Sequence, residues 1–215
     1  MRKLVMSAFV SLDGVMQAPG GPDEDRDGGF PYGGWQFPFA DEELGEIVSA
    51  VYARTGAFLL GRGTYDIFAP YWSQFTDRSD PIATSLNTLP KYVVSTTLTD
   101  PAWASTTVIR ENVPEAVRAL KEEDGGDILI QGSSRLLPTL LQHDLVDEFL
   151  VGIYPVVLGQ GKRLFPEGTP ARTLRLTDSR RTSSGALFNT YAPAGPVTVG
   201  EFGVDDPPRE AAERA

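Results

Sequence analysis

Apolar residues along this chain fall into short uninterrupted runs and into longer stretches in which they recur with helical spacing. The short runs predict β-strands, and Gly, Pro, Asp or Ser residues bound most of them. The predicted strands cover residues 3–10, 57–60, 91–96, 107–109, 127–131, 146–154, 172–177 and 186–192.

The longer stretches predict helices. The clearest begins at Asp41, because Asp caps helix N-termini well. Its apolar stripe consists of Leu44, Ile47, Val48, Val51 and Tyr52. Three more helices are expected near residues 64–69, from Pro114 through Leu120, and from residues 132–134 onward.

Strands that alternate with helices along the chain predict an α/β fold. We expect a central sheet of about eight strands, mostly parallel, with helices on both faces. The last three strands have no helix between them, which predicts an antiparallel edge. Residues 1–195 would form a single domain. Residues 196–215 have little apolar periodicity and would form a partly disordered tail.

A long segment, residues 17–38, separates the first strand from the first helix and is dense in Gly, Pro and Asp. A loop of this length inside a compact domain is usually a lid, a binding loop or a disordered segment. Its aromatic residues favour packing over disorder. We therefore predict a lid over the substrate, with Trp35 and Phe37 as its contact residues.

Charge and composition remove several functional classes. The chain has 215 residues and a net charge of −10 with no basic block, which argues against binding of nucleic acid. The absence of cysteine excludes disulfides, thiolate catalysis and zinc sites built on sulfur. No apolar run is long enough to span a membrane, and the N-terminus does not resemble a secretory signal. We therefore expect a cytoplasmic protein that does not bind membranes.

Familiar catalytic motifs are also missing. His143 is the only histidine, and its predicted place at a helix C-terminus favours a structural role over catalysis or metal binding. No Gly-x-Gly-x-x-Gly motif follows a strand, and Gly161-Lys162 lacks the other residues of a P-loop. We expect no metal site.

Three small-residue turns follow predicted strands, at residues 60–65, 95–97 and 131–134. Free backbone N–H groups at such junctions favour anions, and the guanidinium of Arg62 suits phosphate. Taken singly, each turn could serve only turn geometry and capping. Because ligands of parallel sheets bind at the carboxyl ends of strands, the three together predict a site for a ligand with several phosphates.

Five segments carry a family resemblance. They are SAFVSLDG at 7–14, LLGRGTYD at 59–66, KYVVST at 91–96, DILIQGSSRLL at 127–137 and VDEFLVGIYPVVLGQGKRLF at 146–165. In order and spacing they resemble the dihydrofolate reductase-like superfamily, most closely the branch around the C-terminal reductase domain of the riboflavin-biosynthesis enzyme RibD. The resemblance spans residues 1–192 and implies a three-layer fold that binds NADPH. The zinc-binding motif of the RibD deaminase half is absent.

The resemblance implies that the cofactor contacts lie at strand ends and in the turns that follow them. Those near the nicotinamide and its ribose are Ala8, Val10, Asp13 and Gly14. Those near the 2′-phosphate and pyrophosphate are Gly61, Arg62, Gly63, Thr64, Gln131, Gly132, Ser133, Ser134 and Arg135. Those at the adenosine end are Ser95 and Thr96. Gly159 and Gly161 would let the backbone approach the ligand closely.

The chain departs from dihydrofolate reductases in two places. Gly132-Ser133 stands where they have two glycines. Their Trp-x-x-Pro stretch precedes a carboxylate, and here Trp35 to Pro38 is similar, but one extra residue separates it from Asp41. Asp41 is the candidate catalytic residue, to protonate or orient the substrate, and helix capping is an equal alternative.

We therefore predict an NADPH-dependent reductase of a small heterocyclic substrate, such as 5-amino-6-(5-phosphoribosylamino)uracil from riboflavin biosynthesis. One alternative is a dihydrofolate or pterin reductase, and another is a non-catalytic NADPH-binding module. The three late strands offer a sheet edge and an apolar face, which predicts a homodimer.

Overall fold

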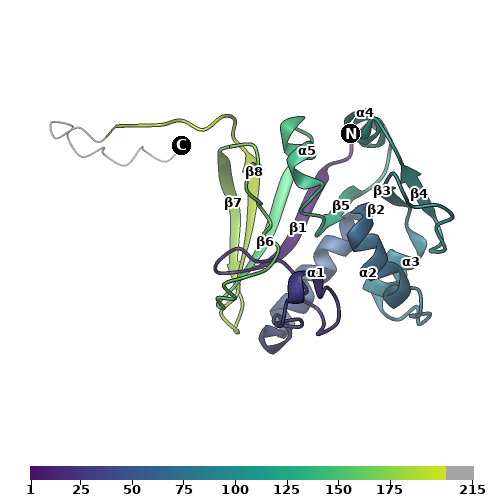
Figure 1. Cartoon of the computed structure of the whole chain (residues 1–215), viewed down its shortest axis with the longest axis horizontal. Coiled ribbons are helices and arrows are strands. Elements are labelled where there is room, and N and C mark those ends of the chain that lie inside the picture. The colour runs from purple at the N-terminus through teal and green to yellow at the C-terminus, as the bar shows by residue number, and fades with distance from the viewer. Residues whose placement is uncertain (202–215) are drawn as a thin grey trace.

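The computed structural model describes residues 1–201, and its centre is an eight-stranded sheet of order β4-β3-β2-β5-β1-β6-β8-β7 (Figure 1). The strands are β1 Leu4–Ser11, β2 Thr55–Gly61, β3 Lys91–Val94, β4 Thr106–Ile109, β5 Asp127–Gln131, β6 Glu148–Tyr154, β7 Leu174–Arg181 and β8 Leu187–Pro193. Strands β1 to β6 are parallel, whereas β8 and β7 continue the sheet antiparallel. The predicted α/β fold and its antiparallel edge are confirmed.

Helices cover both faces of the sheet, as expected. They are α1 Glu42–Arg54, α2 Arg62–Trp72, α3 Pro81–Thr88, α4 Val113–Glu122 and α5 Leu137–Gln142. Buried residues of α4 and α5 pack with Leu4, Met6 and Ile130 in one core cluster. Buried residues of α1, α2 and α3 pack with Val5, Phe58 and other side chains of the opposite face in a second cluster. Figure 1 shows α4 and α5 across the strands from the other three helices.

The sequence prediction missed α3. This helix of eight residues begins with Pro81 and is capped by Asp80, whose carboxylate accepts from the Ile82 N–H at 2.8 Å. Only Ala83 and Leu86 of the helix are fully buried, so its apolar pattern is too sparse to stand out in the sequence.

Several predicted boundaries differ from the structure, and two of the errors have a clear physical cause. A helix was expected from residues 132–134, but Gly132 and Ser133 have φ angles of 61° and 63°, and α5 begins only at Leu137. Successive left-handed residues cannot start a right-handed helix. Strand β7 extends to Arg181 rather than ending at 177, because its pairing with β8 sets its length while its side chains are largely exposed and carry no apolar pattern.

Residues 17–38 pack on the body of the protein rather than standing free of it. They contain the short 3-10 helix η1 Asp27–Gly29 and lead into η2 Phe37–Phe39. Phe30 and Trp35 join Val15, Tyr154 and Phe188 in a third buried cluster. The Trp35 ring lies edge-on to Tyr154 at a centroid distance of 5.6 Å. These aromatic residues therefore anchor the segment, as their presence in the sequence suggested.

Lys91, the first residue of β3, is fully buried. Its ammonium group donates to the carbonyl oxygens of Leu86 and Leu89 at 2.7 and 2.8 Å and lies 4.7 Å from the ring centroid of Trp103. These contacts lie at the C-terminal end of α3, where the helix dipole is negative, and offset part of the cost of burying the charge. Burial lowers the pKa of Lys91 to about 8.

The segment expected to be a tail begins at residue 196. Residues 196–201 form neither helix nor strand, and Val197 and Val199 are exposed. The rest of the predicted tail lies outside the described residues. Within residues 1–201, no helix combines the length and the hydropathy needed to cross a membrane.

Candidate functional site

Strands β1 and β5, at the centre of the sheet, stop pairing before the carboxyl end of β1 and leave an opening there. Strand β5 pairs with β1 only as far as Ser7, which lies opposite Gln131, whereas β6 follows β1 to Ser11. Within residues 1–201, the backbone from Ala8 to Ser11 therefore has no strand neighbour on the β5 side. Successive strand residues point their polar groups to opposite sides, and Ser11 is already bonded to Gly14 and Val15, so the backbone groups of Phe9 face this opening. The carboxyl end of a strand is the expected place for a ligand in an open parallel sheet.

Ser133 joins two of the predicted turns next to this opening. Its hydroxyl oxygen accepts from the Gly61 N–H at 2.8 Å and lies 2.9 Å from the Thr64 hydroxyl oxygen. Gly61 is the N-cap of α2, and Thr64 lies in its first turn. The fold thus brings the predicted residues of the β2 and β5 turns into direct contact.

Arg62 links the same site to the third turn. Its Nε lies 2.8 Å from both carboxylate oxygens of Asp66, and its Nη1 donates to the Thr97 hydroxyl at 3.2 Å. The Ser95 hydroxyl accepts from the N–H groups of Thr97 and Leu98, which fixes that turn. The three turns therefore follow β3, β2 and β5, which are neighbours in the sheet.

Asp13 fixes the other side of the opening. Its carboxylate accepts from the Ser11 hydroxyl at 2.7 Å and from the N–H groups of Leu158 and Gly159 at 3.1 and 2.9 Å. These hydrogen bonds, that of Ser11 first, lower the pKa of Asp13 to about 2. Asp13 is therefore ionised at neutral pH, and its hydrogen bonds link the end of β1 to the segment that follows β6.

The predicted glycines in this region differ in what surrounds them. Gly14 and Gly159 have φ angles of 83° and 76°, and a side chain at Gly159 would meet no other atom within 4 Å. Gly161, with φ 122°, lies against Val15, whose Cγ1 would be 2.6 Å from an added Cβ, and against Phe30. Gly161 therefore allows close packing of the chain, while Gly159 remains open to a ligand.

Gln131 marks the end of the site that faces α1. Its side-chain oxygen accepts from the Tyr52 hydroxyl at 2.8 Å. A crevice of about 20 Å³ lies here between α1 and the sheet. It is lined by Ser7, Phe9, Ile47, Val48, Val51, Tyr52, Gln131, Leu150 and Phe188. The lining is uncharged, and the volume is about that of one water molecule.

Asp41 makes the contacts of a helix cap. Its carboxylate accepts from the Leu44 N–H at 2.9 Å and from the Ser184 N–H at 2.9 Å, which joins α1 to the turn between β7 and β8. Desolvation alone would raise the pKa of Asp41, but these hydrogen bonds outweigh it and hold the pKa well below its ordinary value. These contacts favour the capping alternative, and a catalytic role for Asp41 stays a prediction.

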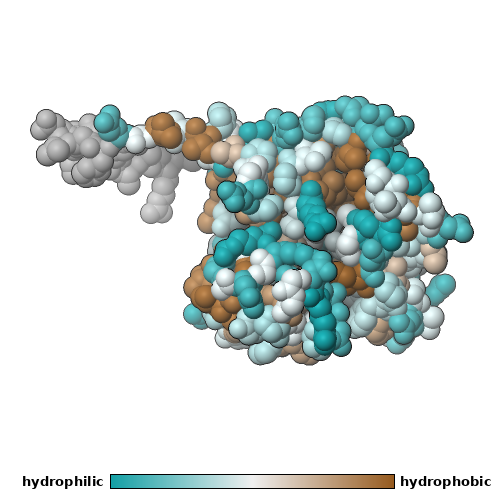
Figure 2. All heavy atoms as spheres, in the orientation of Figure 1, coloured by the Kyte–Doolittle hydropathy of each residue, from teal (hydrophilic) through white to brown (hydrophobic). Residues whose placement is uncertain are grey.

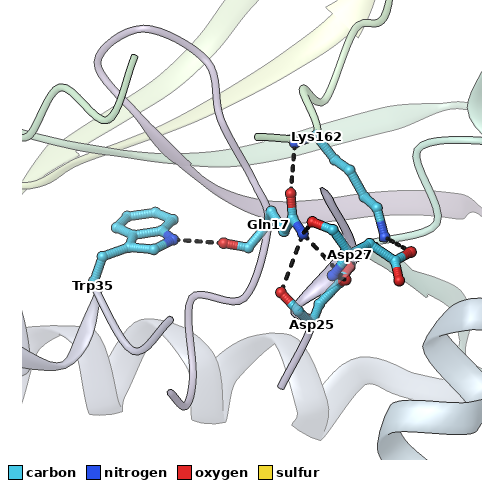
Figure 3. A network of polar contacts seen from close by, with 5 residues as sticks. All are labelled: Gln17, Asp25, Asp27, Trp35 and Lys162. Carbon is cyan, nitrogen blue, oxygen red and sulfur yellow. Dashed lines mark hydrogen bonds and ion pairs between the residues drawn. The ribbon is translucent and has the colours of Figure 1, made fainter. Parts of the chain in front are cut away.

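A polar network secures residues 17–38 (Figure 3). Trp35 donates from its indole N–H to the carbonyl oxygen of Gln17 at 2.8 Å. The Lys162 ammonium lies 2.5 Å from Asp25 and 2.7 Å from Asp27. Phe37, the other predicted lid residue, is 71% exposed and free of this cluster. Trp35 thus anchors the segment while Phe37 projects from it.

Three residues at the site carried no functional signal in the sequence. Arg110, after β4, donates to the carbonyl oxygens of Thr96 and Leu98 and adds a second cation beside the turn that follows β3. Tyr52 appeared only as part of an apolar helix stripe. Lys162 appeared in a rejected P-loop comparison and, with no role assigned, in the family segment at 146–165. The acidic run at residues 23–27 was the one available hint of a cationic partner.

A larger depression lies away from this edge. It has a volume of about 440 Å³ and includes Phe75, Arg78 and Trp103 beside the ends of α2 and α3. None of the predicted site residues line it. It lies near the amino ends of β3 and β4, whereas the three turns follow the carboxyl ends of their strands.

Comparison with known proteins gives a consistent family. The RibD C-terminal domain family matches residues 2–188. Among curated proteins, the chain is 28% identical over 200 residues to the uncharacterized protein YyaP of Bacillus subtilis (strain 168), a match that covers 88% of this chain and 94% of YyaP.

Solved structures agree on the fold. A protein of Shewanella sp. PV-4 described as a riboflavin biosynthesis protein superposes with a TM-score of 0.64 at 18% identity, over 89% of this chain and 99% of that one. The diaminohydroxyphosphoribosylaminopyrimidine deaminase/5-amino-6-(5-phosphoribosylamino)uracil reductase of Thermotoga maritima superposes with a TM-score of 0.59 at 15% identity, over 90% of this chain and 57% of that one.

Proposed function

The chain belongs to the RibD C-terminal domain family, and from that membership and the geometry of its sheet edge we propose that it is an NADPH-dependent reductase of a small heterocyclic substrate. The observation that carries the proposal is the convergence of three turns on one edge, linked by Ser133 and Arg62. Beside them lies a stretch of β1 that has no strand neighbour on the β5 side. A long ligand with phosphates at one end and a flat polar group at the other matches this arrangement.

The residues present fit NADPH. Arg62 and Arg110 supply positive charge at the end of the site where the 2′-phosphate would lie, in a chain whose net charge is −10. Within residues 1–201, hydrogen bonds engage only Nε and Nη1 of Arg62, so Nη2 remains for a phosphate oxygen. Gly61, whose missing side chain makes room for Ser133, is the N-cap of α2, and the N-terminus of that helix would face a pyrophosphate.

NADPH supplies hydride chemistry, and the chain supplies position and shelter. The backbone of Phe9, which lies between the predicted contacts Ala8 and Val10 and faces the open side of β1, would hold the carboxamide of the nicotinamide. The substrate ring would enter from the α1 side, where the crevice between Tyr52 and Gln131 begins. The crevice is too small to hold the ring, but the amide and hydroxyl groups at its mouth carry no charge, which suits the C=O and N–H edge of a planar ring placed outside it.

The source of the proton for a reduced C=N bond is a separate question. Asp41 is ionised and committed to Leu44 and Ser184, and an ionised carboxylate can orient a substrate but cannot donate a proton. The same observation favours water as the donor. It also keeps the non-catalytic NADPH-binding module as a second candidate.

The cofactor proposal is tested by Arg62→Ala. A charge-assisted hydrogen bond contributes about 1.5–3 kcal/mol, or roughly ten- to hundredfold in affinity. Titration calorimetry should show that loss for NADPH and almost none for NADH. Arg118→Ala, which removes a guanidinium from an exposed ion pair with Glu115 on α4, is the matched control. Equal losses for both cofactors would refute the assignment of Arg62 to the 2′-phosphate.

Measuring NADPH oxidation distinguishes an NADPH-dependent reductase from a non-catalytic NADPH-binding module. A reductase oxidises NADPH when given its heterocycle, and the first substrates to try are 5-amino-6-(5-phosphoribosylamino)uracil and dihydropterins. Turnover of the uracil compound alone supports the riboflavin-type reaction, and turnover of dihydropterins alone supports the alternative. Tight NADPH binding without oxidation by either class would favour the module.

We also propose that the protein forms a homodimer. Strand β7 is an unpaired edge among the described residues, and Leu176 and Leu187 of the β7–β8 pair are exposed. The free N–H and C=O groups of such an edge can pair with a strand of a second chain. Light scattering that gives a monomer mass at micromolar concentration would contradict this proposal.

A further inference from the structure

Lys162 forms a clasp with the acidic part of residues 17–38. Its ammonium lies 2.5 Å from Asp25 and 2.7 Å from Asp27, and its backbone N–H donates to the Gln17 side-chain oxygen at 3.0 Å (Figure 3). The Gln17 amide nitrogen donates in turn to the carbonyl oxygens of Asp25 and Asp27 at 3.1 and 3.0 Å. Gln17 is only 4% exposed, so its hydrogen bonds are buried, whereas the ion pairs of Lys162 with Asp25 and Asp27 are more exposed. We refer to this set of contacts among Gln17, Asp25, Asp27 and Lys162 as the clasp.

The clasp borders the phosphate end of the proposed cofactor site. The Met16 N–H donates to the carbonyl oxygen of Lys162 at 2.8 Å. The Met16 methyl carbon reaches to 3.5 Å from the position that a Cβ on Gly132 would occupy. Asp27 is also close enough for Arg135, in the same turn as Gly132, to help Lys162 lower the pKa of its carboxyl group.

The acidic residues within 23–27 lie beside the proposed phosphate site, where their negative charge would oppose binding of an anion. Asp23 is paired with Arg26, and Glu24 is engaged by the N–H groups of Gly20 and Gly21. Asp25 and Asp27 depend on Lys162 for their ion pairs. Figure 2 shows hydrophilic residues gathered over this segment, which is the purple loop in the foreground of Figure 1. Without Lys162, two uncompensated carboxylates would lie beside a site for phosphates and would attract Arg135 away from it.

We infer that Lys162 is a positioning residue for an anionic dinucleotide: it fastens residues 17–38 beside the Gly132 turn and offsets one of the two negative charges of Asp25 and Asp27 there. The inference rests on the proposed function, because it takes the dinucleotide as the ligand. Fastening and charge compensation are separate effects, and each has its own measurement.

Fastening is measured without any cofactor. Arg26 is the only Lys or Arg within residues 17–38, and its side chain is 70% exposed, so trypsin can report on release of the segment by cutting after it. Lys162→Met should be cut at Arg26 several-fold faster than the wild type. Lys3→Met removes an ammonium from the exposed ion pair with Glu148 and should leave the cutting rate unchanged. Equal cutting rates in wild type and Lys162→Met would overturn the fastening role.

Charge compensation is measured by calorimetric titration with NADPH. Two carboxylates near several phosphate charges should weaken binding by about five- to tenfold in Lys162→Met. Adding Asp25→Asn and Asp27→Asn to that variant should restore most of the affinity, because the asparagines repel no phosphate. Added salt should shrink the defect of the single variant by screening.

The outcomes are distinguishable. If Lys162→Met binds NADPH like the wild type, or if the two asparagines restore nothing, the electrostatic role is wrong. If the wild type does not bind NADPH at all, the proposed function fails and with it the electrostatic role, while the trypsin result still decides whether Lys162 fastens the segment.

Discussion

Ser133 offers the sharpest test of how the site is assembled. Its hydroxyl bridges Gly61 and Thr64, and its backbone has a φ of 63°, which is rare for a residue other than glycine. Two substitutions separate these properties. Ser133→Ala removes the hydroxyl and keeps the unfavourable backbone, whereas Ser133→Gly removes the hydroxyl and relieves the backbone.

The magnitudes follow from the contacts. Ser133→Ala leaves the partly buried Gly61 N–H without its acceptor, which costs about 1–3 kcal/mol of unfolding free energy. For a chain of this size that lowers the Tm by roughly 2–4 °C per kcal/mol. A left-handed backbone costs a non-glycine residue about 1–2 kcal/mol, and the extra chain entropy of glycine offsets about 0.5–1 kcal/mol of that gain. Ser133→Gly should therefore be more stable than Ser133→Ala by roughly 0.5–1 kcal/mol.

Differential scanning calorimetry gives the stabilities, and titration with NADPH gives the affinity. Both variants should bind NADPH more weakly than the wild type, because the two turns lose their direct link. Ser85→Ala, which removes an exposed hydroxyl from α3, is the control and should change neither property much. The reasoning is refuted if Ser133→Ala is as stable as the wild type or if Ser133→Gly is the less stable of the two variants.

Three further predictions address other parts of the chain. Asp41→Asn should keep the cap on Leu44 and the Tm, and it should lower turnover roughly 10²–10⁴-fold only if Asp41 is catalytic, so normal turnover would leave Asp41 as a cap. Truncation before Thr198 should leave the Tm and NADPH affinity almost unchanged, and a large drop would show that this segment packs against the domain or a second chain. Between about pH 8 and pH 10.5 the unfolded chain keeps a proton on Lys91 that the folded chain releases, so this residue should make stability rise with pH, and denaturant curves of Lys91→Met should lack that contribution.

Much of the fold could be predicted from local patterns. Runs such as residues 127–131 are apolar on both faces, so the strand is specified by its own sequence, and its predicted limits match β5. The alternation of such runs with helical stretches implied a mainly parallel sheet. The antiparallel edge followed from the lack of helices between the late strands. Where the local pattern is weak, as in α3 and the outer half of β7, neighbouring elements decide the structure and the prediction failed.

The candidate site also has a part that could be predicted from the sequence and a part that could not. The small residues and Arg62 at the strand ends were visible in the sequence because their chemistry is local, and strand direction alone places them on one edge. Contacts between distant residues were not visible. Ser133 meets Gly61 across 72 positions, Tyr52 meets Gln131 across 79, and Lys162 meets Asp25 across 137. The sequence by itself thus determined the sheet, its edge and the kind of ligand to expect. Only the tertiary structure decided which carboxylates are neutralised, which turns touch and how residues 17–38 are held, because these depend on where the chain folds back on itself.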